Sequence, residues 1–108
     1  MTRRKWAVRL SATAEADYAE SLRWTARQFG ATKAAKYGVL LARSLARLER
    51  GPIAAEVRQR DEIGAGLRTL HVGRRGRHII LFRVGSELTG TIDVLRILHD
   101  SIDLARHV

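Results

Sequence analysis

Along four stretches of the chain, apolar residues alternate with polar or small residues, which is the period of a β-strand with one buried face. These stretches are Trp6–Leu10, 67–72, 77–84 and 91–98. Short glycine-containing turns separate the last three stretches, and such short links join antiparallel neighbours. We therefore expect an antiparallel meander in the second half of the chain, with the first strand added at one edge.

Between the first two of these stretches, apolar residues recur every three or four positions, as they do on one face of an α-helix. Ser11 and Thr13 are suitable N-caps for a first helix that ends at Gly30. Thr32 is a suitable cap for a second helix that ends at Gly51-Pro52. Because so few residues separate the two helices, we expect an antiparallel hairpin. The apolar stripes comprise Tyr18, Leu22, Ala26 and Phe29 in the first helix and Ala34, Tyr37, Gly38, Leu41, Leu45 and Leu48 in the second.

Residues 53–66 carry no clear period and contain Gly64 and Gly66, so we expect a loop there. The charged residues that follow the final strand are expected to form a short C-terminal helix. The predicted fold is a single α+β domain over residues 1–108, in which a two-helix hairpin packs on an antiparallel sheet of about four strands.

The composition narrows the class of protein. The chain has no cysteine, which excludes disulfides, thiolate metal sites and cysteine nucleophiles and fits a cytoplasmic protein. No window of about 18 residues is both apolar and free of charge, so no membrane span is expected. The sequence carries no phosphate-loop motif and no convincing catalytic triad, and we expect neither a metal nor a cofactor.

Positive charge dominates the chain, with a formal net charge of +9, which implies an acidic partner such as nucleic acid or an acidic protein. The stretch 67–84 holds five arginines and no acidic residue. Alternation along the predicted central strand places Arg77, Ile79, Leu81 and Arg83 on the face turned away from the helices. This face would be a partly apolar, cationic docking surface, although a charge run is also typical of a solvated face.

The last predicted strand runs into His99 and Asp100, and two roles are open for this histidine. It either hydrogen-bonds Asp100 or Asp103 and pins the chain end to the sheet, or it contacts a target. His71 and His78 lie on neighbouring predicted strands and could approach each other. Because no third ligand lies nearby, we expect no metal site there.

The element order and three segments resemble the RelE/ParE superfamily of toxins from type II toxin–antitoxin modules. The segments are Gly66-Leu67-Arg68, the strand Arg77-His78-Ile79-Ile80-Leu81-Phe82-Arg83-Val84, and the run Leu95-Arg96-Ile97-Leu98-His99 with its tail Asp103-Leu104-Ala105-Arg106-His107. The tail is similar to that of ParE-type members, in which a strand ending in a histidine precedes a short charged turn. The resemblance covers nearly the whole chain.

The resemblance implies one of two activities: ParE-type members inhibit DNA gyrase, and RelE-type members cleave mRNA on the ribosome. RNA cleavage through the 2′-hydroxyl needs an acid, a base and cations, and the candidates here are Arg68, Arg77, Arg83 and His99. Both tyrosines lie on the apolar helix stripes, and residues 37–108 contain no lysine. The sequence therefore favours gyrase inhibition by contact, with the ribonuclease and a plain basic nucleic-acid-binding module as alternatives.

The resemblance also implies a cognate ParD-like antitoxin, whose N-terminal half would bind operator DNA, so that the toxin meets this DNA only through the antitoxin. Trp24 is either a peripheral core residue or an aromatic anchor for that partner. The predicted target-binding residues, where the target is gyrase or alternatively the ribosome, are Arg68, Arg74, Arg75, Arg77, Arg83, Arg96, His99 and Arg106. The predicted antitoxin-binding residues are Trp24, Leu40, Arg43, Arg47 and Arg50.

Overall fold

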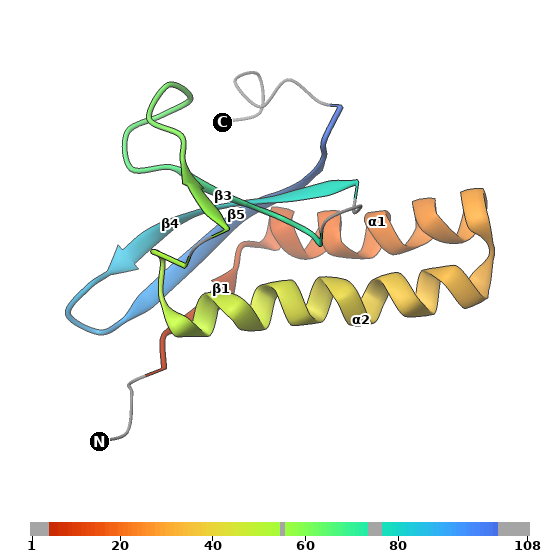
Figure 1. The fold of residues 1–108 in the computed structure, drawn as a ribbon, viewed down its shortest axis with the longest axis horizontal. Coiled ribbons are helices and arrows are strands. Elements are labelled where there is room, and N and C mark those ends of the chain that lie inside the picture. Colours follow the sequence, from red (N-terminus) through yellow and green to blue (C-terminus); the bar gives the residue numbers. More distant parts are fainter. Residues whose placement is uncertain (1–4, 55, 74–76, 102–108) are drawn as a thin grey trace.

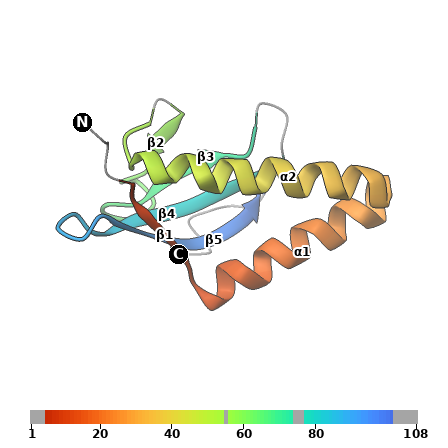
Figure 2. The same cartoon turned by 90° about the horizontal axis from the view of Figure 1, so that it is seen from below.

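A computed structural model, which describes residues 5–54, 56–73 and 77–101, has two helices packed on one face of a five-stranded sheet (Figures 1 and 2). In chain order the elements are β1 (Ala7–Leu10), α1 (Ala12–Phe29), α2 (Ala31–Arg47), the 3₁₀ turn η1 (Leu48–Arg50), β2 (Val57–Gln59), β3 (Arg68–His71), β4 (His78–Ser86) and β5 (Thr91–His99). The predicted α+β class and helical hairpin are confirmed. The expected C-terminal helix falls outside the described residues.

Capping residues define where the two helices of the hairpin begin and end. The Ser11 side chain accepts the Ala14 N–H at 3.0 Å, as expected of an N-cap. Gly30 ends α1 with a φ of 92°, a conformation that favours glycine, and its N–H donates to the Ala26 carbonyl. Because Gly30 is also the N-cap of α2, the second helix begins one residue before Thr32, which was the predicted cap.

The sheet has the strand order β1-β5-β4-β3-β2 and is mixed rather than purely antiparallel. β1 pairs parallel with β5, and the other neighbours pair antiparallel. The fifth strand, β2, lies in the region predicted to be a loop. It was missed because it has only three residues, of which Arg58 and Gln59 are exposed, so no alternation can be read from it.

The core lies between the helices and one face of the sheet. Ile80 and Phe82 of β4 lie on this face, as predicted, and are fully buried with Leu41 of α2. On β5 the predicted alternation is wrong beyond Val94, because a β-bulge at Leu95 shifts the register. The register pairs Ile97 and His99 with Ile80 and His78, so these two residues, rather than Arg96 and Leu98, follow Val94 on the helix side.

The face turned away from the helices is less apolar at its surface than predicted. Leu81 and Leu98 are on this face by register, and both are buried, as is Thr69. Arg77 and Arg83 are exposed, so cationic groups do reach solvent next to the sheet. None of the described helices is long and apolar enough to span a membrane.

Candidate functional site

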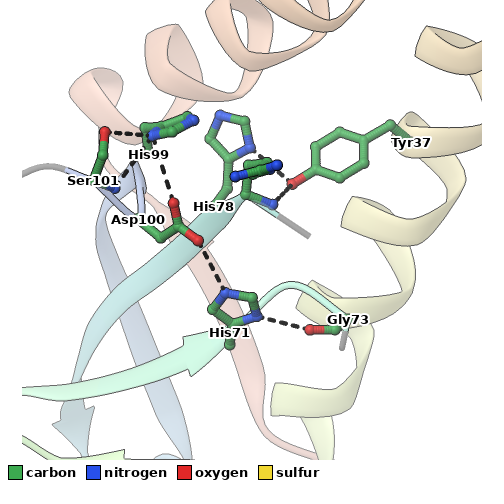
Figure 3. A network of polar contacts seen from close by, with 8 residues as sticks. Tyr37, His71, Gly73, His78, His99, Asp100 and Ser101 are labelled. Atoms are coloured by element: carbon green, nitrogen blue, oxygen red, sulfur yellow. Dashed lines mark hydrogen bonds and ion pairs between the residues drawn. The ribbon is translucent and has the colours of Figure 1, made fainter. Parts of the chain in front are cut away.

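Four aromatic and imidazole rings meet where β4 begins and β5 ends. His78 and His99 are cross-strand partners, and their ring centroids are 5.5 Å apart (Figure 3). Trp24 of α1 packs edge-on at 5.2 Å from the His99 ring and 6.0 Å from the His78 ring. Tyr37 of α2 lies 5.4 Å from the His78 ring. The cluster therefore joins both helices to the end of the sheet.

Tyr37 and His78 form a fixed, neutral pair. The Tyr37 hydroxyl oxygen lies 2.7 Å from His78 Nδ1 and accepts the Arg77 backbone N–H at 3.2 Å (Figure 3). Because a tyrosine hydroxyl can both donate and accept, this contact is a hydrogen bond with either neutral tautomer of His78: the hydroxyl donates to an unprotonated Nδ1 or accepts from Nδ1–H. Burial lowers the pKa of His78 to about 4 and raises the pKa of Tyr37. Neither group is poised to exchange a proton near neutral pH.

Asp100 bridges two histidines at the end of β5. Its carboxylate oxygens lie 3.6 Å from His71 Nε2 and 3.6 Å from His99 Nδ1 (Figure 3). His99 Nδ1 also accepts the Ser101 backbone N–H at 3.2 Å, and the Asp100 N–H donates to the Arg77 carbonyl at 2.7 Å. The Asp100 N–H and carboxylate thus tie the end of β5 to Arg77 and His71, whereas the polar contacts of the His99 ring are to its chain neighbours Asp100 and Ser101. The pinning role of His99 stays a prediction, and Asp103, its other predicted partner, lies outside the described residues.

His71 and His78 do not form a pair. His71 is opposite Ile79 in the β3–β4 register, whereas His78 is on the core side of the sheet, so the two rings project from opposite faces. Within the described ranges, no group of three His, Asp or Glu side chains is placed to hold a metal ion.

The cations predicted for RNA cleavage do not converge. Arg77 precedes β4 beside the ring cluster, whereas Arg83 is six residues further along, about 20 Å at the rise of a β-strand. Arg83 is opposite Asp93 in the register. Arg68 pairs with Phe82 across the sheet and donates to the Pro52 carbonyl at 3.0 Å. Only Arg77 of these three therefore lies beside His99.

Arg96, another predicted target contact, is held within the fold. Its guanidinium forms a two-pronged ion pair with Asp17 of α1, at 2.8 and 3.1 Å. The predicted contacts Arg74, Arg75 and Arg106 lie outside the described residues.

A groove lies between the helical hairpin and the start of β4. It has a volume of about 470 Å³ and combines aromatic and aliphatic walls with three cationic side chains. We call it the first groove; it is lined by Trp24, Thr25, Phe29, Lys33, Lys36, Tyr37, Leu40 and Arg77. Phe29 is 53% exposed although it belongs to the predicted apolar stripe, so this part of the stripe faces the groove rather than the core.

A second groove of about 710 Å³ continues along α2 and shares Leu40 with the first. It is lined by Leu40, Arg43, Ser44, Arg47, Glu56, His71 and Gly73. Four of the five residues predicted to bind the antitoxin, Trp24, Leu40, Arg43 and Arg47, thus line two adjoining grooves. Arg50, the fifth, lines neither of them.

The sequence assigned Tyr37 to core packing and did not predict the hydrogen bonds of its hydroxyl group. One signal was available, because a partly buried tyrosine hydroxyl usually needs a hydrogen-bond partner and histidine is a suitable one. Phe29, Lys33 and Lys36 were also missed as groove residues, since their place beside Trp24 depends on how the two helices pack.

Comparisons with known proteins agree with this geometry. Residues 8–104 match the family described as the ParE toxin of the type II toxin–antitoxin system parDE. A chain from a chromosomal ParDE toxin–antitoxin system of P. aeruginosa superimposes with a TM-score of 0.71 at 23% identity, covering 89% of this chain and 97% of that chain. A chain from the toxin–antitoxin complex RelBE2 of Mycobacterium tuberculosis gives a TM-score of 0.55 at 22% identity, covering 88% and 98%. No curated protein matches the sequence significantly.

Proposed function

Because the chain belongs to the ParE family of toxins from type II toxin–antitoxin systems, we propose that it inhibits DNA gyrase and is neutralised by a cognate ParD-like antitoxin. The observation that carries the proposal is the family match over residues 8–104. The cationic, partly apolar grooves along α2 offer a binding site of the kind that an acidic protein segment requires. Operator DNA would be bound by the antitoxin and not by this chain.

The proposed target surface is the end of the sheet around Arg77 and His99, together with Arg83. Arg68 and Arg96 are weaker candidates, because their guanidinium groups already bond to Pro52 and Asp17. Arg74, Arg75 and Arg106 remain predicted contacts. Since gyrase works in the cytoplasm, the toxin would act there.

Inhibition by contact fits the chemistry of the site better than RNA cleavage does. His78 is buried and neutral, and the pKa of Tyr37 is raised by burial. Among the described residues, Arg77 is the one predicted cation beside His99. An acid, a base and clustered cations are all needed to cleave RNA at a useful rate, and these residues do not provide the full set.

The test uses the purified chain in two reactions, gyrase-driven supercoiling of plasmid DNA and a translation mix that contains a labelled mRNA. We expect supercoiling to be lost while the mRNA stays intact. Adding the protein encoded by the adjacent gene should restore supercoiling. Cleaved mRNA with normal supercoiling would instead identify the chain as a ribosome-dependent endoribonuclease.

A further inference from the structure

A further pocket, which shares Trp24 with the first groove, lies between α1 and the end of β5. It has a volume of about 250 Å³, and we call it the histidine pocket because His78 and His99 both line it. The sequence suggests His71 as the neighbour of His78, whereas the sheet register makes His78 and His99 direct cross-strand partners. Two imidazole rings therefore meet at one pocket.

The two rings are placed as a pair of metal ligands requires. In Figure 3 one nitrogen of His78 and one nitrogen of His99 point toward each other. These are the Nε2 atoms, because the Nδ1 atoms contact Tyr37 and Ser101. Two imidazoles on one tetrahedral zinc ion, with each nitrogen about 2.0–2.1 Å from the metal, have ring centres roughly 5–5.5 Å apart. The observed separation of the ring centres is 5.5 Å.

The other nitrogen of each ring has an oxygen partner that can hold the ring in place. His78 Nδ1 lies 2.7 Å from the Tyr37 hydroxyl, and His99 Nδ1 lies 2.7 Å from the Ser101 hydroxyl. The Asp100 carboxylate lies 3.6 Å from the same His99 atom. When Nε2 binds a metal, Nδ1 carries the proton and needs such an acceptor. His99 Nδ1 would then donate to the Ser101 hydroxyl instead of accepting the Ser101 N–H.

The charged groups of the pocket fit a metal ion better than an anion. Besides the histidines, its charged lining residues are Asp17, Glu20 and Arg96. The Arg96 guanidinium is held by both carboxylate oxygens of Asp17, at 2.8 and 3.1 Å. An anion would have to compete with Asp17 for this guanidinium, whereas a metal ion needs only the nitrogen lone pairs of the two rings.

We propose that His78 and His99 bind one divalent transition-metal ion through their Nε2 atoms, with water in the remaining positions. Imidazole suits Zn²⁺, Ni²⁺ and Cu²⁺, whereas Mg²⁺ and Ca²⁺ prefer oxygen ligands. Within the part of the chain that the structure describes, no third His, Asp or Glu side chain is placed to join the two histidines. The site is therefore open, and a bound ion would link the start of β4 to the end of β5.

The experiment titrates the full chain, free of any affinity tag, with ZnCl₂ near neutral pH in a calorimeter. We expect one zinc ion per chain. His99→Gln should weaken zinc binding about tenfold or more, because it removes one of the two protein ligands. The same loss is expected of His78→Gln. Since His78 is buried, that variant can also lower stability, and the partly exposed His99 keeps the test valid in that case.

His71→Gln is the matched control. His71 is in the same sheet and also lies 3.6 Å from the Asp100 carboxylate, but its ring projects from the opposite face. His107, the remaining histidine of the chain, is outside the described residues and is replaced in a second control, His107→Gln. Each control should change the zinc affinity less than about twofold, because neither histidine belongs to the proposed ligand pair.

Copper reports the number of ligands. Because Cu²⁺ shares the preference for imidazole, the paramagnetic resonance spectrum of the copper-loaded chain should show coupling to two nitrogens, and that of His99→Gln to one. Zinc should also raise the melting temperature of the wild-type chain more than that of His99→Gln. The reason is that folding brings the two histidines together, so the ion binds the folded chain in preference to the unfolded one.

Three results would overturn the proposal: no binding at millimolar zinc, copper coupled to a single nitrogen in the wild-type chain, or equal zinc affinity of His99→Gln and the wild-type chain. None of these measurements involves gyrase or the adjacent gene product. Failure of the metal site would therefore leave the proposed function standing, and failure of the proposed function would leave the metal site standing.

Discussion

The hydroxyl group of Tyr37 bonds two neighbours at once, since it shares a hydrogen bond with His78 Nδ1 and accepts the Arg77 N–H. Replacing Tyr37 with phenylalanine removes both hydrogen bonds but keeps the ring. We expect the Tyr37→Phe variant to lose about 1–2 kcal/mol of unfolding free energy, because it leaves His78 Nδ1 and the Arg77 N–H without this hydrogen-bond partner. Urea unfolding followed by circular dichroism measures this loss.

Tyr18→Phe is the control for that variant. Tyr18 packs against the same core from α1, and its hydroxyl makes no hydrogen bond to another described residue. The two variants therefore lose the same atom from different surroundings. Equal stability of the two variants would show that the Tyr37–His78 bond adds nothing to the fold.

His78 makes the stability of the fold depend on pH. Burial, with a smaller effect of His99, lowers the pKa of His78 from 6.5 to about 4. Between these two values the unfolded chain binds more protons than the folded chain. The free energy of unfolding is therefore highest above about pH 6.5 and decreases as the pH falls toward 4. After allowance for solvent that reaches the ring, this decrease in the free energy of unfolding amounts to about 2 kcal/mol.

Urea titrations at pH 7 and pH 5 measure this effect in the wild-type chain and in His78→Gln. The glutamine amide can donate to or accept from the Tyr37 hydroxyl but does not titrate. We expect a flatter pH dependence for the variant. The same dependence in both proteins would assign it to the carboxylates instead.

Single residues were the hardest features to predict from the sequence. The helical period places Tyr37 on an apolar stripe correctly, yet it says nothing of the histidine that meets its hydroxyl 41 residues later. In the same way, nothing in the sequence near Arg96 indicates that Asp17 binds it. Such contacts depend on how distant elements pack, and one local pattern does not encode them.

At the scale of the elements, Asp17 joins α1 to the bulged part of β5. Its carboxylate bonds to the Arg96 guanidinium and accepts the Ile97 N–H at 3.0 Å, with only 16% of the Asp17 side chain exposed. Asp17→Asn leaves the Arg96 charge partly buried without its partner. We expect a loss of about 2 kcal/mol of unfolding free energy, measured by urea unfolding.

Glu20→Gln is the matched control on the same helix. Glu20 is exposed, and among the described residues it pairs with Arg23 and Arg27 alone, which are exposed residues of α1 as well. Exposed pairs of this kind contribute little, so no measurable change is expected. A comparable loss of unfolding free energy in both variants would contradict the stabilising role given to the Asp17–Arg96 ion pair.

Long elements with a regular period could be predicted, and short or irregular ones could not. β4 and both helices follow from alternation and helical spacing over many residues, reinforced by Ser11 and Gly30 at the helix ends. β2 is too short to show a period. The bulge at Leu95 reverses the alternation without any glycine to mark it, so the faces of the last residues of β5 were assigned wrongly.

At the scale of the whole molecule, the first groove, where we propose that the antitoxin binds, and the proposed target surface share residues. Arg77 lines the first groove, and Trp24 lines it too while packing against His99. A partner seated in the first groove would therefore cover or hold part of the surface that we propose for target binding. This overlap offers a physical route to neutralisation that needs no change of fold.

His99 lies beside this overlap without lining the first groove, which allows target binding and antitoxin binding to be separated. We expect His99→Ala to bind the antitoxin like the wild-type chain and to be less toxic, because the variant removes a predicted target contact that lines neither groove. Growth of cells expressing the variant, with and without the adjacent gene, measures toxicity, and co-purification measures antitoxin binding. Since the His99 ring also packs against Trp24 and His78, the melting temperature must be compared as well. Unchanged toxicity would leave His99 with a structural role alone, whereas reduced toxicity at an unchanged melting temperature would support the proposed target contact.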